Sequence, residues 1–208
     1  MKTLIIDCDG VLFPESLFKK SDMGKYLHNE FSSNDTNRKK YNKTYDEMIK
    51  RKEHGFFNFI FNLFDKEMTL FDKFCLNMFN SLDYSKIKRD DELFELLLKV
   101  GKKYDICILS NNHKFHLDRV YKNLFGKTVE QIPFKSYDIS STLKDGFFHP
   151  KFSDGYKIFL EKINKKNTEC IVFDDSLENI EKCVEYKIPY IFITPNNTLK
   201  MALEKLTN

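Results

Sequence analysis

The chain has no tryptophan, only five cysteines among 208 residues, and a formal net charge of only +3 from 34 basic and 31 acidic residues. The cysteines are scattered singly, with no Cys-x-x-Cys pair, which argues against a disulfide framework and a thiolate zinc site. A nearly balanced charge gives no support for a nucleic-acid partner, because proteins that bind a duplex usually carry a strongly basic face. The cysteines are Cys8, Cys75, Cys107, Cys170 and Cys183.

Long apolar runs are also missing. No stretch approaches the ~20 consecutive apolar residues of a membrane-spanning helix. The first apolar run, Leu4 to Ile6, is too short for a secretory signal and leads directly into Asp7. We therefore expect a cytoplasmic protein with reduced thiols and no membrane partner. The sequence leaves its oligomeric state open.

Four short apolar runs are present, each bounded by polar residues. Near-continuous runs of β-branched and apolar residues are typical of strands buried on both faces of a parallel sheet. Segments with helical spacing separate the runs, and this alternation predicts an α/β protein with a Rossmann-like parallel sheet. A fifth strand is expected near residues 132–139. The apolar runs cover 3–7, 104–110, 169–175 and 189–194, and the helical segments 91–103, 113–125, 156–163 and 177–186.

The segment 14–84 has a different pattern, with long amphipathic stretches and no clear strand. It predicts a small α-helical domain inserted into the α/β domain, which would consist of residues 1–13 and 85–208. The phenylalanines at positions 56, 57, 59, 61 and 64 are expected to form the core of the insert. The polar stretch 31–43 is expected to be a loop or a solvated helix turn.

Polar and acidic side chains follow three of the apolar runs. Because the carboxyl ends of parallel strands share one edge of a sheet, we expect these side chains to lie close together. Two carboxylates ~4 Å apart repel by roughly 4 kcal/mol, so four of them need a cation, and oxygen ligands favour Mg²⁺. Gly10 permits a sharp turn after the first run. The three sets are Asp7 with Asp9, Ser110 with Asn111, and Asp174 with Asp175.

Three motifs at these positions resemble those of the haloacid dehalogenase (HAD) superfamily, in its phosphatase branch. DCDGVLF resembles the first motif, LSNN the second and FDDSLENI the fourth, in the same order. That superfamily places a helical cap just after the first motif, where this chain has its insert. The resemblance implies a HAD-like core with an inserted cap and Mg²⁺-dependent phosphatase activity.

The resemblance also implies a role for each residue that matches a motif. Asp7 would be the nucleophile that forms an aspartyl-phosphate, and Asp9 the general acid and then the general base. Asp7, the backbone carbonyl of Asp9 and Asp175 would bind the metal, with Asp174 as a further ligand or a close neighbour. Ser110 and the backbone amide of Asn111 would bind phosphate.

The third motif of the superfamily is a lysine that neutralises the carboxylates and the phosphate. Lys151 and Lys144 are the candidates here, and we favour Lys151. It lies one position nearer the helix at Tyr156 than the superfamily pattern expects, and no proline follows it.

Other polar residues near these motifs are interpreted as structural. By strand alternation, Cys8 is expected to point away from the two acids and to pack in the interior. His113 and His116 have the His-x-x-His spacing of some metal sites, but no third ligand is near in sequence, so we interpret them as a surface or packing pair. Asn179 is expected to be structural.

The function expected from this combination is a Mg²⁺-dependent phosphatase for a small phosphorylated metabolite, with a nucleotide 5′-monophosphate or a sugar phosphate as candidate substrates. One alternative is a phosphosugar mutase of the same superfamily, since mutases keep both acids. Another is a non-catalytic binding module on the same fold. The sequence identifies neither the substrate nor the pathway.

Overall fold

The computed structural model describes residues 1–13, 26–27, 29–31, 35–51 and 55–207. The chain divides into two compact units. The core unit comprises Met1–Leu17, Asp83–Lys144 and His149–Asn208, and the insert unit comprises Phe18–Leu82 together with Asp145–Phe148. The short second segment of the insert unit, 145–148, had no counterpart in the sequence analysis.

The core unit is built on a five-stranded sheet in the order β3-β2-β1-β6-β7, with every neighbouring pair parallel. The four apolar runs and the weaker fifth run all form strands of this sheet, so the predicted α/β parallel-sheet architecture is confirmed. The strands are β1 Thr3–Ile6, β2 Asp105–Leu109, β3 Lys135–Tyr137, β6 Cys170–Asp174 and β7 Tyr190–Phe192.

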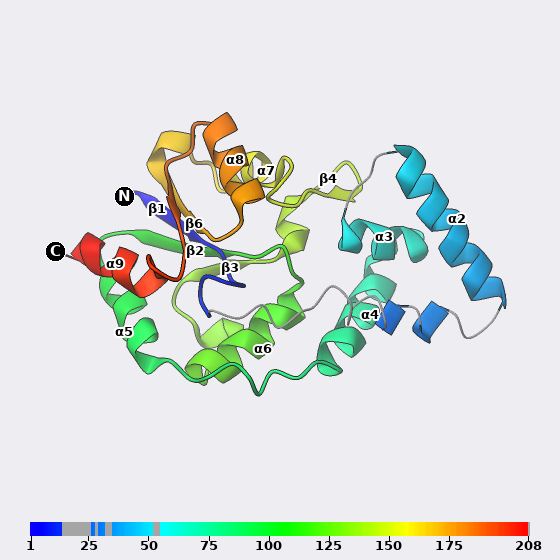
Figure 1. The fold of residues 1–208 in the computed structure, drawn as a ribbon, viewed down its shortest axis with the longest axis horizontal. Coiled ribbons are helices and arrows are strands. Elements are labelled where there is room, and N and C mark those ends of the chain that lie inside the picture. The colour runs from blue at the N-terminus through cyan, green and yellow to red at the C-terminus, as the bar shows by residue number, and fades with distance from the viewer. Residues whose placement is uncertain (14–25, 28, 32–34, 52–54, 208) are drawn as a thin grey trace. The chain divides into compact units, whose positions relative to one another are not determined.

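Helices cover both faces of the sheet (Figure 1), with α7 and α8 on one side and α5, α6 and α9 on the other. Side chains from β1, β2 and β6 pack against Tyr156 and Phe159 of α7 and Cys183 of α8 in one buried cluster. The sequence analysis did not anticipate α9. The helices are α5 Asp91–Val100, α6 Lys114–Phe125, α7 Gly155–Lys162, α8 Leu177–Glu185 and α9 Leu199–Thr207, with short 3-10 helices at Val129–Gln131, Ile139–Thr142 and Asn167–Glu169.

Local sequence signals set the ends of these helices. The side chain of Asp90 accepts a hydrogen bond from the backbone N–H of Leu93 at the start of α5. Such a cap satisfies one of the N–H groups that has no partner within the helix. Gly126 ends α6 in the left-handed conformation, with φ 65°, which glycine adopts without steric cost.

The insert unit contains α2 Asp35–Arg51, α3 Phe56–Leu63, α4 Met68–Asn80 and the short strand β5 Phe147–Phe148. Its interior is aromatic: of the five phenylalanines expected there, Phe57, Phe59 and Phe61 are buried, whereas Phe56 and Phe64 are half-buried. The expectation of a loop or a solvated helix turn at 31–43 is wrong from Asp35 onward, because the 17-residue helix α2 begins there; residues 32–34 lie outside the described residues. The side chains of α2 are mostly charged or amide, but Tyr41 and Tyr45 pack on Phe59 of α3, and Thr44 beside them is buried.

Two hydrogen bonds tie segment 145–148 to α3. The side-chain amide of Asn58 donates to the carbonyl of Phe148 at 2.8 Å, and its oxygen accepts from the N–H of Phe148 at 2.8 Å. The ring of Phe148 packs on Phe61 and Phe71. Across the described residues, no helix combines the length and apolarity needed to cross a bilayer.

The short strand β4 Leu143–Lys144 comes directly before segment 145–148 in the sequence and belongs to the core unit.

Candidate active site

The carboxyl ends of β1, β2 and β6 are level with one another. Ile6 is paired with Ile108 on one side and with Phe173 on the other. The next residue, Asp7, continues the pairing by donating its N–H to the carbonyl of Phe173 at 2.9 Å. We call this edge the carboxyl rim; it presents the residues that follow each of the three strands.

Lys151 lies at the carboxyl rim, buried between two carboxylates. Its Nζ is 2.5 Å from Oδ1 of Asp7 and 2.9 Å from Oδ2 of Asp174, and the residue is only 1% exposed. Its backbone N–H donates to Oδ1 of Asn111 at 2.9 Å, so the loop after β2 helps to position the lysine. The other candidate, Lys144, instead pairs with the exposed Glu161 at 3.1 Å.

Asp174 is fully buried, and both of its oxygens are occupied by donors. Oδ2 accepts from the Tyr156 hydroxyl at 2.7 Å as well as from Lys151, and Oδ1 accepts from the backbone N–H of Ser176 and the amide of Asn179, each at 2.9 Å. Burial alone would raise the pKa of Asp174, but Lys151 and these hydrogen bonds lower it below the ordinary value. The carboxylate is therefore a fixed acceptor that holds Lys151. Asn179 helps to orient it, which is the kind of structural role expected from the sequence.

Asp175 is exposed, unlike its neighbour, and it packs against Gly10. Gly10 has φ 78°, and a Cβ at this position would overlap the Asp175 carboxylate. Glycine is thus required here both for its backbone conformation and for its lack of a side chain. The turn after β1 and the turn after β6 can approach closely only because of it.

Asp7, Asp174 and Asp175 each offer an oxygen within 4.8 Å of the other two. Burial, opposed by Lys151 and reinforced by Asp174, raises the pKa of Asp7 well above its ordinary value. Burial and the charge of Asp174 also raise the pKa of Asp175. One lysine therefore leaves this group short of positive charge.

The oxygen ligands of this carboxylate group fit a hard divalent cation. Carboxylate oxygens are the ligands that Mg²⁺ prefers, and a cation would favour the ionised forms that the surroundings now disfavour. Asp7 and Asp175 are the carboxylates that could hold it, because the oxygens of Asp174 are already occupied by donors. The side chain of Asp9 does not join this group within the described part of the chain.

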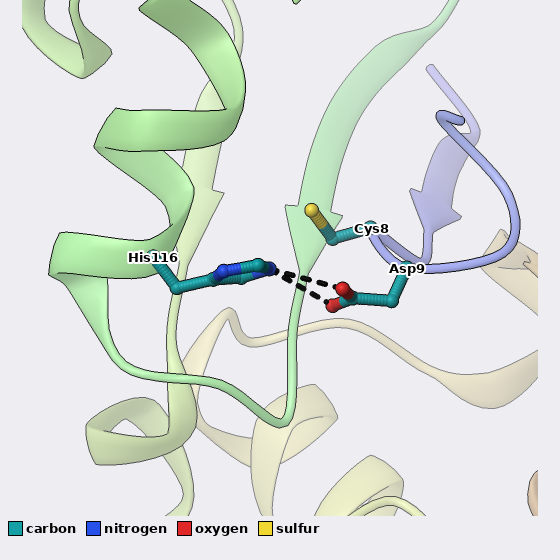
Figure 2. A group of neighbouring side chains, drawn as sticks. All are labelled: Cys8, Asp9 and His116. Carbon is teal, nitrogen blue, oxygen red and sulfur yellow. Dashed lines mark hydrogen bonds and ion pairs between the residues drawn. The ribbon is translucent and has the colours of Figure 1, made fainter. Parts of the chain in front are cut away.

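Asp9 instead faces His116 (Figure 2) and is also bound by Asn112. Nε2 of His116 lies 3.0 Å from Oδ1 and 3.2 Å from Oδ2 of Asp9, and the Asn112 amide donates to Oδ2 at 2.8 Å. Burial opposes ionisation, but His116 and Asn112 lower the pKa of Asp9. A hydrogen bond of 3.0 Å joins Nδ1 of His116 to the Tyr84 hydroxyl.

His113 and His116 are both buried, as the interpretation of a packing pair allows, but His116 also has a contact that this interpretation missed. His113 is buried and its ring accepts from the N–H of Phe115 at the start of α6, which is a structural role. His116, fully buried one turn later, reaches Asp9, which lies 107 residues earlier in the chain. The His-x-x-His spacing did not indicate this contact, because only the second histidine takes part in it.

Cys8 also differs from its expected orientation. It is fully buried, as expected, but its sulfur lies within 4.8 Å of ligand atoms of both Asp9 and His116. The chain leaves the strand conformation after Ile6, where β1 ends, so strict alternation no longer fixes the direction of the Cys8 side chain. Burial and the two neighbouring acids raise the pKa of its thiol.

Ser110 follows β2 and is buried at the rim, with its N–H donating to the carbonyl of Tyr137 at 2.9 Å. Its hydroxyl oxygen accepts from the N–H of Asn112 at 3.0 Å. This short loop thus supports Lys151 through Asn111 and Asp9 through Asn112.

Comparisons with known proteins give structural likenesses only: no family model matches the chain, and no curated protein does. A HAD family enzyme from Bacteroides thetaiotaomicron, solved with magnesium and inorganic phosphate, has 22% identity and a TM-score of 0.55, covering 93% of this chain and 94% of that one. CbbY from Rhodobacter sphaeroides, solved with phosphate, has 12% identity and a TM-score of 0.53, covering 92% of this chain and 85% of that one.

These likenesses extend over nearly the full length of the chains compared. At such low identity they establish the fold and leave the activity to the residues of the site. The chain therefore has the fold of these HAD enzymes, as the resemblance of its three motifs implied.

Proposed function

We propose that this protein is a Mg²⁺-dependent phosphatase that hydrolyses a small phosphate monoester through an aspartyl-phosphate on Asp7. The observation that carries the proposal is the placement of Lys151 between Asp7 and Asp174, on the same rim as Asp175. A buried ammonium beside a nucleophilic carboxylate suits a transferring phosphoryl group, whose negative charge it would stabilise.

In the first step an Asp7 oxygen attacks phosphorus, and the bond from phosphorus to the ester oxygen of the substrate breaks. Asp9 must first take up a proton, because His116 and Asn112 lower its pKa in the free site, and it then gives that proton to the departing oxygen. In the second step Asp9 accepts a proton from a water molecule that attacks phosphorus, and the bond to Asp7 breaks. Phosphate is released and both carboxyl groups return to their starting states.

The remaining residues of the rim bind and orient the phosphoryl group. Ser110 and the backbone amide of Asn111 would donate to its oxygens, and Lys151 would neutralise one of its charges. Asp7, Asp175 and the backbone carbonyl of Asp9 would hold Mg²⁺. When bound, Mg²⁺ would supply further positive charge for the phosphoryl oxygens.

Release of inorganic phosphate from a panel of sugar phosphates and nucleotide 5′-monophosphates tests the proposal. We expect Mg²⁺-dependent release that Asp7→Asn abolishes and that the matched surface variant Lys144→Met leaves unchanged. A phosphoenzyme trapped by acid quench, absent in Asp7→Asn, would support the intermediate. Isomerised sugar phosphate without net release would instead identify a mutase, and absence of both turnover and phosphoenzyme would identify a binding module.

The structures with phosphate support the same class of ligand. CbbY was also solved, as a mutant, with xylulose-1,5-bisphosphate, at 11% identity and a TM-score of 0.52 over 95% of this chain and 90% of that one. A sugar phosphate is therefore the first group of substrates to screen.

A further inference from the structure

A second group of ligand atoms lies beside the proposed Mg²⁺ site and has a different chemistry. The sulfur of Cys8, a carboxylate oxygen of Asp9 and a ring nitrogen of His116 lie within 4.8 Å of one another. Cys8 and Asp9 come from the turn after β1, and His116 comes from the first turn of α6 (Figure 2). Cys8 and His116 are fully buried.

The nitrogen and oxygen of this group are already spaced like two ligands of one ion. Nε2 of His116 is 3.0 Å from Oδ1 of Asp9. In a tetrahedral zinc site, Zn–N and Zn–O bonds of about 2.0–2.2 Å put the two ligand atoms roughly 3.3 Å apart. A small increase in the distance between Nε2 of His116 and Oδ1 of Asp9 would therefore admit the ion. The sulfur of Cys8 would have to move toward these two atoms to become the third ligand.

Neighbouring side chains orient the two ligands. A hydrogen bond of 3.0 Å joins Nδ1 of His116 to the Tyr84 hydroxyl, and when Nδ1 carries the proton and donates it to Tyr84, Nε2 presents a lone pair that can bind a metal. The amide of Asn112 engages Oδ2 of Asp9 and leaves Oδ1 toward the histidine. Outer partners of this kind are a usual feature of protein metal sites, because they fix the ligand rotamer and the imidazole tautomer.

We propose that Cys8, Asp9 and His116 form a second metal site that takes a borderline-soft divalent ion such as Zn²⁺. Sulfur and imidazole ligands favour Zn²⁺ and Co²⁺ over Mg²⁺, which prefers an all-oxygen shell. Three protein ligands leave a fourth position for water. The Asp9 side chain is 20% exposed and gives solvent access to the group. Metal binding releases the thiol proton of Cys8 and the proton that Nε2 of His116 now shares with Asp9, both to solvent.

Occupation of this site would inhibit the reaction. This consequence rests on the proposed function, because the ion would hold the same carboxylate that is to exchange a proton with the leaving oxygen and with water. Zn²⁺ at this site would not compete with Mg²⁺ for Asp7 and Asp175. The inhibition should therefore persist when Mg²⁺ is added in large excess.

Binding of Co²⁺, followed by absorption in the presence of excess Mg²⁺, tests the site without any assay of activity. We expect about one equivalent to give the intense near-ultraviolet band of a thiolate bound to cobalt, and Zn²⁺ to displace it. Cys8→Ser and His116→Gln should each remove the band. Cys107→Ser, which changes another buried cysteine, and Asp175→Asn, which changes the Mg²⁺ site, should both retain it.

The outcomes separate this inference from the proposed function. A missing band, or an equal band in Cys8→Ser, would overturn the metal site and leave His116 as a hydrogen-bond partner of Asp9 only. Circular dichroism establishes that each variant is folded, and Cys8→Ala replaces Cys8→Ser if the latter unfolds. A protein that forms the band but hydrolyses no phosphate would keep the site and lose the phosphatase. If the wild type is active, inhibition by Zn²⁺ should be weakened at least tenfold in Cys8→Ser.

Discussion

The ammonium of Lys151 and the carboxylate of Asp174 form a buried pair, 2.9 Å apart, and Asp7 meets the same ammonium from the other side. Lys151 should therefore contribute both to the stability of the fold and to the proposed reaction. Removing one partner of a buried pair leaves the other charge without compensation, which typically costs about 3–5 kcal/mol.

We therefore predict that Lys151→Met lowers the free energy of unfolding by about 3 kcal/mol or more and reduces phosphatase activity at least ~10²-fold. Urea denaturation and phosphate-release kinetics measure the two effects. Lys144→Met is the matched control and should change the stability by less than ~1 kcal/mol, because Lys144 forms only a surface ion pair with Glu161. Equal effects of the two substitutions would contradict the assignment of Lys151.

The raised pKa of Asp7 predicts a gain in stability when its charge is removed. Above an unfolded-state pKa of ~3.9 and up to the raised folded value, the folded chain binds more protons than the unfolded one. The free energy of unfolding therefore falls as the pH rises through this window. In a chelator, Asp7→Asn should be inactive and about 1 kcal/mol or more stabler than wild type at pH 7.

This advantage should shrink as the pH falls toward ~4, where Asp7 is protonated in both states. Thermal or urea unfolding of both proteins from pH 4 to pH 8 measures the difference. Asp174 remains as a partner for Lys151 in the variant, so loss of Asp7 leaves no unpaired lysine. An advantage that grows toward acid would mean that Lys151 outweighs burial at Asp7.

The approach of Asp175 to Gly10 predicts a strong effect of a single methyl group. Gly10→Ala would place its Cβ on the Asp175 carboxylate and would force a left-handed backbone on alanine. We expect the apparent affinity for Mg²⁺, measured by activity against Mg²⁺ concentration, to fall at least tenfold. Gly101→Ala is the control, since the nearest atom to its added Cβ is a backbone oxygen 3.2 Å away and no site residue is nearby. Similar Mg²⁺ affinity in both variants would show that Asp175 is not held against Gly10.

The contact between His116 and Asp9 predicts a dependence on the leaving group. Without His116 or its partner Tyr84, Asp9 is less well oriented to protonate the departing oxygen. His116→Gln, and to a smaller degree Tyr84→Phe, should slow hydrolysis of an alkyl phosphate ~10- to 100-fold, and that of an aryl phosphate with a good leaving group much less.

Asp9→Asn gives the reference pattern for this experiment, because it removes the acid itself. The ratio of kcat/KM values for the two substrates is the measurement, in metal-free buffer supplemented with Mg²⁺ only. A purely structural role of His116 would lower both values by the same factor, and the ratio would then stay at the wild-type value.

Much of the core fold could be predicted from the sequence because the strands are short apolar runs whose last residues are polar. The placement of Asp7, Ser110 and Asp174 near one another follows from a parallel sheet alone. The partners of Asp9 could not be found in this way. His116 lies 107 positions from Asp9 in the chain, and only the packing of α6 beside β1 brings the two together.

Asp174 and Asp175 show a second limit of the sequence pattern. The two adjacent acids are indistinguishable in type, but one is saturated with hydrogen bonds in the interior and the other is exposed. This difference depends on donors from Tyr156 and Asn179, whose directions are set by the helices that carry them. Helix α2 of the insert was harder to predict, because most of its side chains are charged or amide and only a narrow stripe with Tyr41 and Tyr45 packs on Phe59.

The hydrogen bonds between Phe148 and Asn58 have a practical consequence for any study of the core unit alone. The chain passes between the two units at 17/18, 82/83, 144/145 and 148/149. Deleting residues 18–82 alone would remove Asn58, which binds the backbone of Phe148, and the rings of Phe61 and Phe71, on which Phe148 packs. The side chain of Phe148, now 2% exposed, would then face water. A minimal version of the core unit should therefore also exchange residues 145–148 for a polar turn.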